Sequence, residues 1–136
     1  MDELEKIKRE KIKGIVKNME RQNYPDKPIK ISDNDFESTI AKYPLVVIDC
    51  WAIWCAPCLM MAPMIEELAK KYKGRIIFGK LDVSRNRSVP AKFGIRGIPT
   101  LLVFNKGKLI DRIVGVQPIN VLDSRLKRHL ENLKKS

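Results

Sequence analysis

The chain of 136 residues has little of several features that mark common protein classes. Its three cysteines are an odd number and follow no secretory leader, which argues against a disulfide-stapled extracellular scaffold. Charges begin at Asp2, without the apolar centre of a signal peptide. The longest uncharged run, residues 50–65, falls short of the roughly 20 residues that a membrane span needs. We therefore expect a cytoplasmic protein that does not enter the membrane.

The charge is strongly unbalanced, at +11 from 27 basic and 16 acidic residues. One interpretation is nucleic-acid binding, and the other is a solvated, lysine-rich surface. The basic residues are spread over the whole chain and are not interleaved with aromatic residues. We therefore favour the solvated surface and expect no nucleic-acid partner.

The first 28 residues form an extension that precedes a single domain at residues 29–136. Six apolar residues fall within about half of a helical wheel, although Glu5, Lys8 and Lys11 intrude on that arc. Such a helix can pack on the domain, stay partly frayed, or bind a partner or a second copy. Membrane-surface binding is the least favoured use, because acids are mixed among the bases. We expect a monomer and keep self-association through this helix as an alternative. The six apolar residues are Leu4, Ile7, Ile12, Ile15, Val16 and Met19.

Residues 49–65 are the stretch around which the rest is organised. The run from Leu45 to Ile48 predicts a buried strand. The apolar and small residues after Pro57 predict a long helix that Pro63 should kink. Cys55 then lies just before the first helical turn, where free backbone N–H groups and the helix dipole favour a thiolate. Cys58 lies one turn further on and should be less exposed. We expect Cys55 to attack a substrate disulfide and Cys58 to resolve the mixed disulfide.

The segment 49–58, Asp-Cys-Trp-Ala-Ile-Trp-Cys-Ala-Pro-Cys, resembles the active-site segment of thioredoxins. The segment 94–100, Gly-Ile-Arg-Gly-Ile-Pro-Thr, is similar to the thioredoxin cis-proline loop, and residues 105–108 and 114–116 match the following hairpin turn and glycine. The resemblance covers roughly residues 29–134. It implies an α/β thioredoxin fold, with a mixed central sheet between helices and the N-terminal helix as an addition. Ile53, Ala56 and Leu59 depart from the usual pattern. The change at Ala56 leaves the redox potential open, and Leu59 makes the rim of the site more apolar, which can narrow or shift the set of partners.

The strands are expected at residues 28–31, 45–48, 76–83, 100–104 and 109–114. Ser32 is predicted to cap a short helix that runs to Lys42, and further helices follow Pro57, Arg87 and Pro118. Asn105 to Lys108 should form a hairpin turn.

The resemblance also implies roles for residues outside the cysteine pair. Asp49, inside an apolar strand, should have a raised pKa and relay the proton of Cys58, or else be a buried acid paired with a structural lysine. Lys80 matches the family lysine that neighbours this acid, as salt-bridge partner and pKa tuner. Pro99 should follow a cis peptide that turns the Ile98 backbone toward substrate, against the alternative of an ordinary trans proline. The expected substrate surface comprises Trp54, Ala56, Pro57, Gly97, Ile98, Pro99, Val114, Gly115 and Val116.

Four other features have simpler interpretations. Cys50 should point to the opposite sheet face from Asp49 and be an inert buried thiol. Met60, Met61 and Met64 are interpreted as core residues. His129, the only histidine, is expected on the polar side of the last helix. No zinc site is expected, because only Cys50 and His129 would be left to complete four ligands.

The sequence thus predicts a thioredoxin that reduces protein disulfides, needs no bound cofactor and is regenerated by a thioredoxin reductase. One rival is a disulfide oxidase or isomerase, which would have a less reducing potential and an exported context. Another is a non-catalytic subunit in which the domain is a docking module and the N-terminal helix binds the partner.

Overall fold

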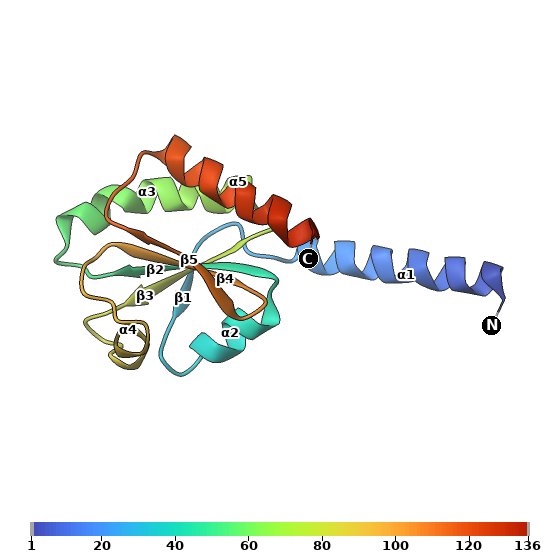
Figure 1. Ribbon diagram of the computed structural model, residues 1–136, viewed down its shortest axis with the longest axis horizontal. Helices are drawn as coiled ribbons and strands as arrows, with labels where there is room; N and C mark the ends of the chain where they lie inside the picture. Colours follow the sequence, from blue (N-terminus) through green and yellow to red (C-terminus); the bar gives the residue numbers. More distant parts are fainter. Residues whose placement is uncertain (1, 136) are drawn as a thin grey trace.

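A computed structural model describes residues 2–135 of the chain. Along this range helices and strands alternate except at β4 and β5, which follow each other as the sequence predicted, and one helix precedes the first strand (Figure 1). The helices are α1 (Glu3–Gln22), α2 (Phe36–Lys42), α3 (Ala56–Lys71), α4 (Ser88–Lys92) and α5 (Ile119–Lys135). The strands are β1 (Ile29–Ile31), β2 (Leu45–Trp51), β3 (Ile77–Asp82), β4 (Thr100–Asn105) and β5 (Lys108–Val114).

The five strands form one mixed sheet in the order β1-β3-β2-β4-β5. The strands β1, β3 and β2 pair in parallel, whereas β4 pairs antiparallel with both β2 and β5. The turn between β4 and β5 has positive φ at Lys106 and Gly107, the geometry of the tightest hairpins, so the predicted hairpin is confirmed. The central strand β2 is buried along almost its whole length, as its run of β-branched residues predicted.

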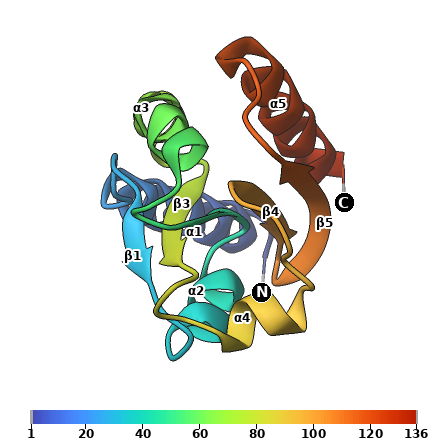
Figure 2. The same cartoon turned by 90° about the vertical axis from the view of Figure 1, so that its left-hand side faces the viewer.

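Helices cover both faces of the sheet, with α3 and α5 on one side and α2 and α4 on the other (Figures 1 and 2). Alternate residues of β2 supply the two cores: Leu45 and Val47 pack toward α3 and α5, and Val46 and Ile48 pack toward α2 and α4. Gly79 in β3 allows this second core to close, because a Cβ there would lie 2.6 Å from the Ile31 side chain. Only a residue without a side chain leaves room for these neighbours.

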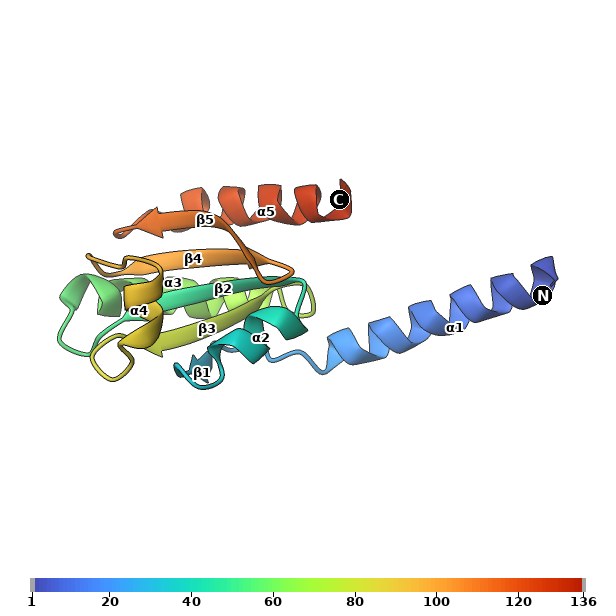
Figure 3. The ribbon, with the colours of Figure 1, turned by 60° about the horizontal axis from the view of Figure 1, so that its bottom comes forward.

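Helix α1 contacts the domain at its last turn, where Arg21 lies beside Gly74. It extends away from the end of the sheet where β2 begins (Figures 1 and 3), and none of its residues is buried. All six apolar residues of its stripe are exposed, from 46% for Val16 to 60% for Ile12. Of the uses considered for this helix, packing of its apolar stripe on the domain is therefore wrong, and the other uses stay predictions. No described helix is long and apolar enough to cross a membrane.

One predicted helix start is also wrong. Helix α2 begins at Phe36 after Asp35, and Ser32 does not cap it. Instead, the backbone N–H of Ser32 donates a 2.7 Å hydrogen bond to the Asp35 carboxylate, so the residues between them form a turn before the helix. Both residue types suit caps and turns, and local sequence alone did not distinguish them.

Candidate functional site

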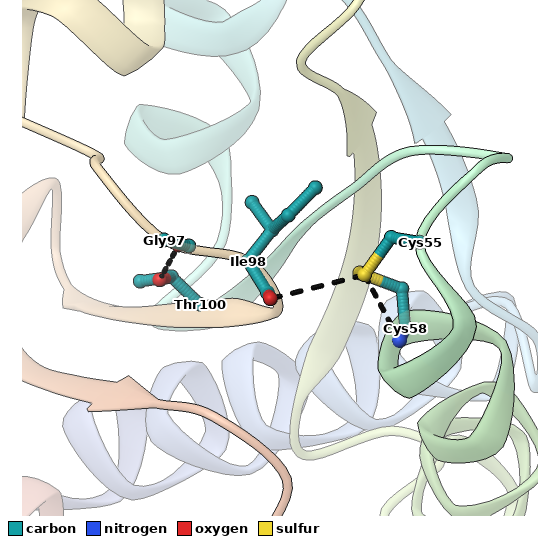
Figure 4. Close-up of a disulfide and its surroundings, with 5 residues drawn as sticks. All are labelled: Cys55, Cys58, Gly97, Ile98 and Thr100. Atoms are coloured by element: carbon teal, nitrogen blue, oxygen red, sulfur yellow. Dashed lines mark hydrogen bonds between the residues drawn. A yellow bond between two sulfur atoms is a disulfide. The ribbon is translucent and has the colours of Figure 1, made fainter.

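The cysteine pair lies at the junction between β2 and α3. Cys55 is the N-cap of α3, with an extended backbone, and Cys58 follows one turn later with Pro57 in the first turn. The two residues form a disulfide, and their Cα atoms are 5.3 Å apart (Figure 4). Cys55 is 5% exposed and Cys58 is 2% exposed, which agrees with the expected order. The pair is therefore nearly closed to solvent and is reached from the Cys55 side.

The surroundings of the Cys55 sulfur suit a thiolate. Its Sγ accepts a 3.2 Å hydrogen bond from the backbone N–H of Cys58, one of the free donors at the start of α3. Such a donor, together with the helix dipole, stabilises negative charge on sulfur. The Ile98 carbonyl oxygen lies 3.8 Å from the same sulfur (Figure 4). In the disulfide this is a contact only, since the sulfur carries no hydrogen, whereas the reduced thiol has a proton to donate there.

The loop opposite the disulfide has the expected cis peptide between Ile98 and Pro99. Thr100 Oγ1 donates a 2.6 Å hydrogen bond to the Gly97 carbonyl, and the Gly115 N–H donates a 2.8 Å bond to the Pro99 carbonyl. The first bond closes the loop on itself, and the second fastens the end of β5 to the loop. Three segments distant in sequence, at residues 53–58, 97–100 and 114–116, therefore meet around Cys55.

Asp49 is buried in β2 and is only 2% exposed. Neither of its carboxylate oxygens has a hydrogen-bond partner. Burial raises the pKa of Asp49 to about 6, against the opposing influence of the Lys80 charge. A carboxylic acid with this pKa can hold or release a proton near neutral pH, as a general acid–base group must.

Lys80 is the register partner of Asp49 on β3, but it is not its salt-bridge partner. Its ammonium group lies 4.3 Å from the centre of the Trp51 ring, a cation–π arrangement. The lysine therefore acts on Asp49 through its charge rather than through a hydrogen bond. The expectation of a salt bridge is wrong, because register neighbours share a strand pairing but their side chains can turn to other partners.

The side chains around the disulfide are exposed and apolar. Trp54 is 71% exposed and Val114 is 58% exposed, while Ile98 is half-buried. Ala56, Pro57 and Gly97 are also exposed, and Pro99 is buried beneath them. The residues predicted to form a substrate surface are therefore brought to one end of the molecule.

Cys50 lies on the opposite face of β2 from Asp49, in the core beside α2 and α4. Burial and the nearby Asp49 charge raise the pKa of its thiol to about 12, although Arg112 opposes this. The thiol is therefore inert at neutral pH. Within residues 2–135 no cluster of three or more potential metal ligands occurs.

One expectation for a methionine is wrong. Met61 and Met64 pack in the core, but Met60 is 65% exposed near the cysteines. Its spacing from Met61 turns it about 100° away around the helix. His129 is half-buried on the side of α5 that also carries Arg125, as expected of the polar side, and its Nε2 lies 2.8 Å from the Asp111 carboxylate. Asp111 also accepts two hydrogen bonds from Arg125, and sequence reasoning missed this cluster.

Comparisons with known proteins agree with this geometry. The family model described as Thioredoxin matches residues 27–128. A thioredoxin of Staphylococcus epidermidis is 45% identical over 102 residues, which span 75% of this chain and 97% of that protein. A thioredoxin of Staphylococcus aureus is 44% identical over 102 residues, which again span 75% of this chain and 97% of that protein. The solved structure of a mutant thioredoxin from Halobacterium salinarum NRC-1 has a TM-score of 0.73 at 29% identity, covering 77% of this chain and 92% of its own.

The matched range contains the cysteine pair, Asp49 and the cis-proline loop, and only α1 and the two ends of the chain lie outside it. A disulfide-forming pair on this scaffold makes the protein a protein-disulfide oxidoreductase, and the chain belongs to the thioredoxin family.

Proposed function

We propose that this protein is a cytosolic thioredoxin that reduces protein disulfides and is regenerated by a thioredoxin reductase. The observation that carries the proposal is the Cys55 sulfur, positioned at the helix start with a backbone donor and facing an open carbonyl at Ile98. A reducing compartment also suits the unpaired thiol of Cys50. The cysteines themselves carry the electrons, so no bound cofactor is required.

The reaction follows from the positions of the two sulfurs. The Cys55 thiolate attacks one sulfur of the substrate disulfide, forms a mixed disulfide and releases the other substrate sulfur as a thiolate. Cys58 then loses its proton and attacks Cys55, which closes the Cys55–Cys58 disulfide and releases the second substrate thiolate. Two electrons pass to the substrate, and the reductase returns them to the cysteine pair.

Asp49 is proposed as the group that takes the proton of Cys58 during resolution. Its burial, its unpaired oxygens and its pKa of about 6 support this role. Lys80 is proposed as a positioning residue that lowers the pKa of Asp49 through its charge. The carbonyl of Ile98 is proposed to receive a backbone N–H of the substrate, in the manner of an added strand.

We also propose that residues 29–136 form the catalytic domain, as a monomer, and that residues 1–28 are an appended segment. The family match begins at residue 27, and α1 buries no residue against the domain.

Trapping with single-cysteine variants tests the assignment of roles. Cys58→Ser should accumulate a mixed disulfide between Cys55 and a protein substrate, while Cys55→Ser should accumulate none. Mass spectrometry of the trapped species identifies the bonded cysteine. Faster alkylation of Cys58 than of Cys55 in the reduced protein at neutral pH would contradict the assignment.

Equilibration of the pair against a glutathione series separates a reductase from an oxidase. A reductase should stay largely reduced only in strongly reducing mixtures, near the potential of about −270 mV typical of thioredoxins. A potential nearer the roughly −120 mV of a strong oxidant would favour the disulfide oxidase instead.

A further inference from the structure

The exposed apolar side chains of the domain are gathered at its redox end. Outside α1, large exposed apolar side chains occur at eight described positions, and six of these lie at residues 53–60 and 114–116. They are Ile53, Trp54, Leu59, Met60, Val114 and Val116. The gathering of apolar surface at one place on a highly charged protein marks an interaction site.

Charge is missing from the same segments. Charged residues make up 32% of the chain, yet none occurs at residues 50–65, 97–105 or 113–122. The sulfur of Cys55 and the carbonyl of Ile98 join the first two segments, and the bond from Gly115 to Pro99 joins the third. The exposed residues of these three segments therefore lie together around the disulfide, and the exposed cation Arg96 immediately precedes the second segment.

One part of this surface lies beyond the residues that we assigned to substrate binding. Ile53 is 66% exposed, Leu59 is 47% exposed and Met60 is 65% exposed. We call these three residues the helix-side patch, since they precede α3 or lie in its first two turns. Glu66 and Glu67 are the next charged residues along α3, so the patch continues the substrate surface without a charged border on this helix.

We infer that the helix-side patch binds large apolar side chains that flank the target cysteine of a substrate, and that the preferred substrates are therefore non-native polypeptides. This inference rests on the proposed function. Apolar residues next to a disulfide are buried in folded proteins and become exposed when the chain is unfolded or misfolded. The patch offers such chains apolar area without demanding a particular hydrogen bond, and the flexible thioether of Met60 adapts to different shapes.

The alternative is selection by charge. The net charge of +11 attracts acidic substrates over long range, but the segments that surround Cys55 hold no cation to pair with them. Selection at the site should therefore depend on apolar area and change little with salt concentration, because salt screens charges and leaves apolar contacts intact.

The test compares two peptide disulfides of equal charge, with leucine on both sides of the cysteine in one and glutamine in the other. The pre-reduced protein is mixed with each peptide, and the second-order rate constant is followed by tryptophan fluorescence. Wild-type protein should react about tenfold faster with the leucine peptide, a ratio typical of apolar pockets. Leu59→Gln/Met60→Gln should bring the two rates within about twofold of each other, chiefly by slowing the leucine peptide.

Helix α1 provides a matched control. Leu4 and Met19 are both 59% exposed on a helix that extends away from the domain. Leu4→Gln/Met19→Gln removes the same side chains and should keep the full leucine preference. An equal loss in this control, or wild-type rates that do not differ between peptides, would overturn the inference.

Two further substrates separate this inference from the proposed function. Hydroxyethyl disulfide is small and uncharged, so all variants should reduce it at equal rates. If the protein reduced none of these disulfides, the proposed function would fail, whereas reduction without a leucine preference would remove the inference alone. The patch variant should reduce scrambled ribonuclease, a non-native chain, several-fold more slowly than wild type. The control variant should reduce it at the wild-type rate. Equal rates of the two variants on it would contradict the assignment of non-native substrates.

Discussion

Two aspartates on the same sheet have opposite surroundings: one has hydrogen-bond partners and a lowered pKa, and the other has no partner and a raised pKa. Asp111, on the edge strand β5, accepts hydrogen bonds from Arg125 at 2.5 and 3.1 Å and lies 2.8 Å from His129. Asp49, on the central strand β2, has no partner for either oxygen. Burial alone would raise the pKa of Asp111, but His129 and Arg125 lower it below its usual value, while the pKa of Asp49 rises to about 6.

The difference distinguishes a residue that stabilises the fold, Asp111, from one that we assign to the functional site, Asp49. The Asp111 cluster joins β5 to α5 at the edge of the sheet, where its hydrogen bonds hold the last helix in place. Asp49 destabilises the fold, because an ionised carboxylate without partners is costly in the interior. A feature that costs stability and sits in the strand leading to the cysteines is best explained by function. Each variant below tests one side of this contrast.

Asp111→Ala should have the largest effect on stability. It leaves the partly exposed Arg125 guanidinium and the His129 ring without their acceptor, so we expect the free energy of unfolding to fall by about 2 to 3 kcal/mol. Disulfide reduction at a temperature where the variant stays folded should be unchanged. Urea unfolding measures the first quantity, with Asp26→Ala as the control in an exposed linker residue. A loss similar to that of the control would mean that the cluster is an ordinary surface pair.

Asp49 and Asp111 should each change the free energy of unfolding in a different range of pH. Between about pH 4 and 6 the native state keeps the Asp49 proton that the unfolded chain has lost, so stability falls as pH rises, by roughly 3 kcal/mol in total. Asp111 acts in the opposite direction, and its contribution is lost as pH falls through its lowered pKa, below about 3.8.

Urea midpoints at stepped pH values measure these slopes. Asp49→Asn should flatten the curve between about pH 4 and 6 and leave the acid limb intact. Equal slopes for wild type and Asp49→Asn through this window would show that Asp49 is ionised without cost.

Asp49→Asn should raise stability and slow the reaction. Loss of the buried charge should add about 1 to 3 kcal/mol at neutral pH, less than the full pH effect because the amide is also without partners. Resolution by Cys58 should slow by about tenfold or more, since general acid–base catalysis commonly contributes at least that much. Single-turnover kinetics and urea unfolding on the same variant measure both. If the rate stayed unchanged from mildly acidic to mildly basic pH, the proton relay would be ruled out.

Cys50→Val should have the smallest effect. Cys50 neighbours Asp49 in sequence but lies in the other core, so the change should leave disulfide reduction within about twofold of wild type and alter stability by less than about 1.5 kcal/mol. The insulin reduction assay gives the rate. A tenfold loss of activity without unfolding would assign Cys50 a role in the chemistry.

The sequence predicted the parts of this molecule that depend on local chemistry. The cis bond before Pro99 was implied by the family resemblance. The helix start at Cys55, the hairpin at Lys106 and Gly107 and the burial of β2 were predicted from short segments. Each is fixed by a few adjacent residues whose conformational preferences are strong. The family resemblance brought the distant segments together where local patterns could not.

The parts that were missed depend on pairings across the fold. Asp111 and His129 are 18 residues apart, and nothing in either local segment indicates that β5 and α5 bring them into contact. Similarly, the position of Lys80 opposite Asp49 was predicted, but its preference for the Trp51 ring over the carboxylate was not. Met60 was misjudged because three methionines at helical spacing suggest one face, whereas the helix separates Met60 from Met61.

The isolation of α1 has a consequence for how the protein melts. Because none of its residues is buried, the stability of this helix comes from its own 20 residues and its Asp2 cap, with Gly14 as a weak point in the middle. It should lose its circular dichroism gradually on warming, well before the single sharp transition of the domain. Its amide hydrogens should exchange rapidly with solvent deuterium, while those of β2 should exchange only when the whole domain opens.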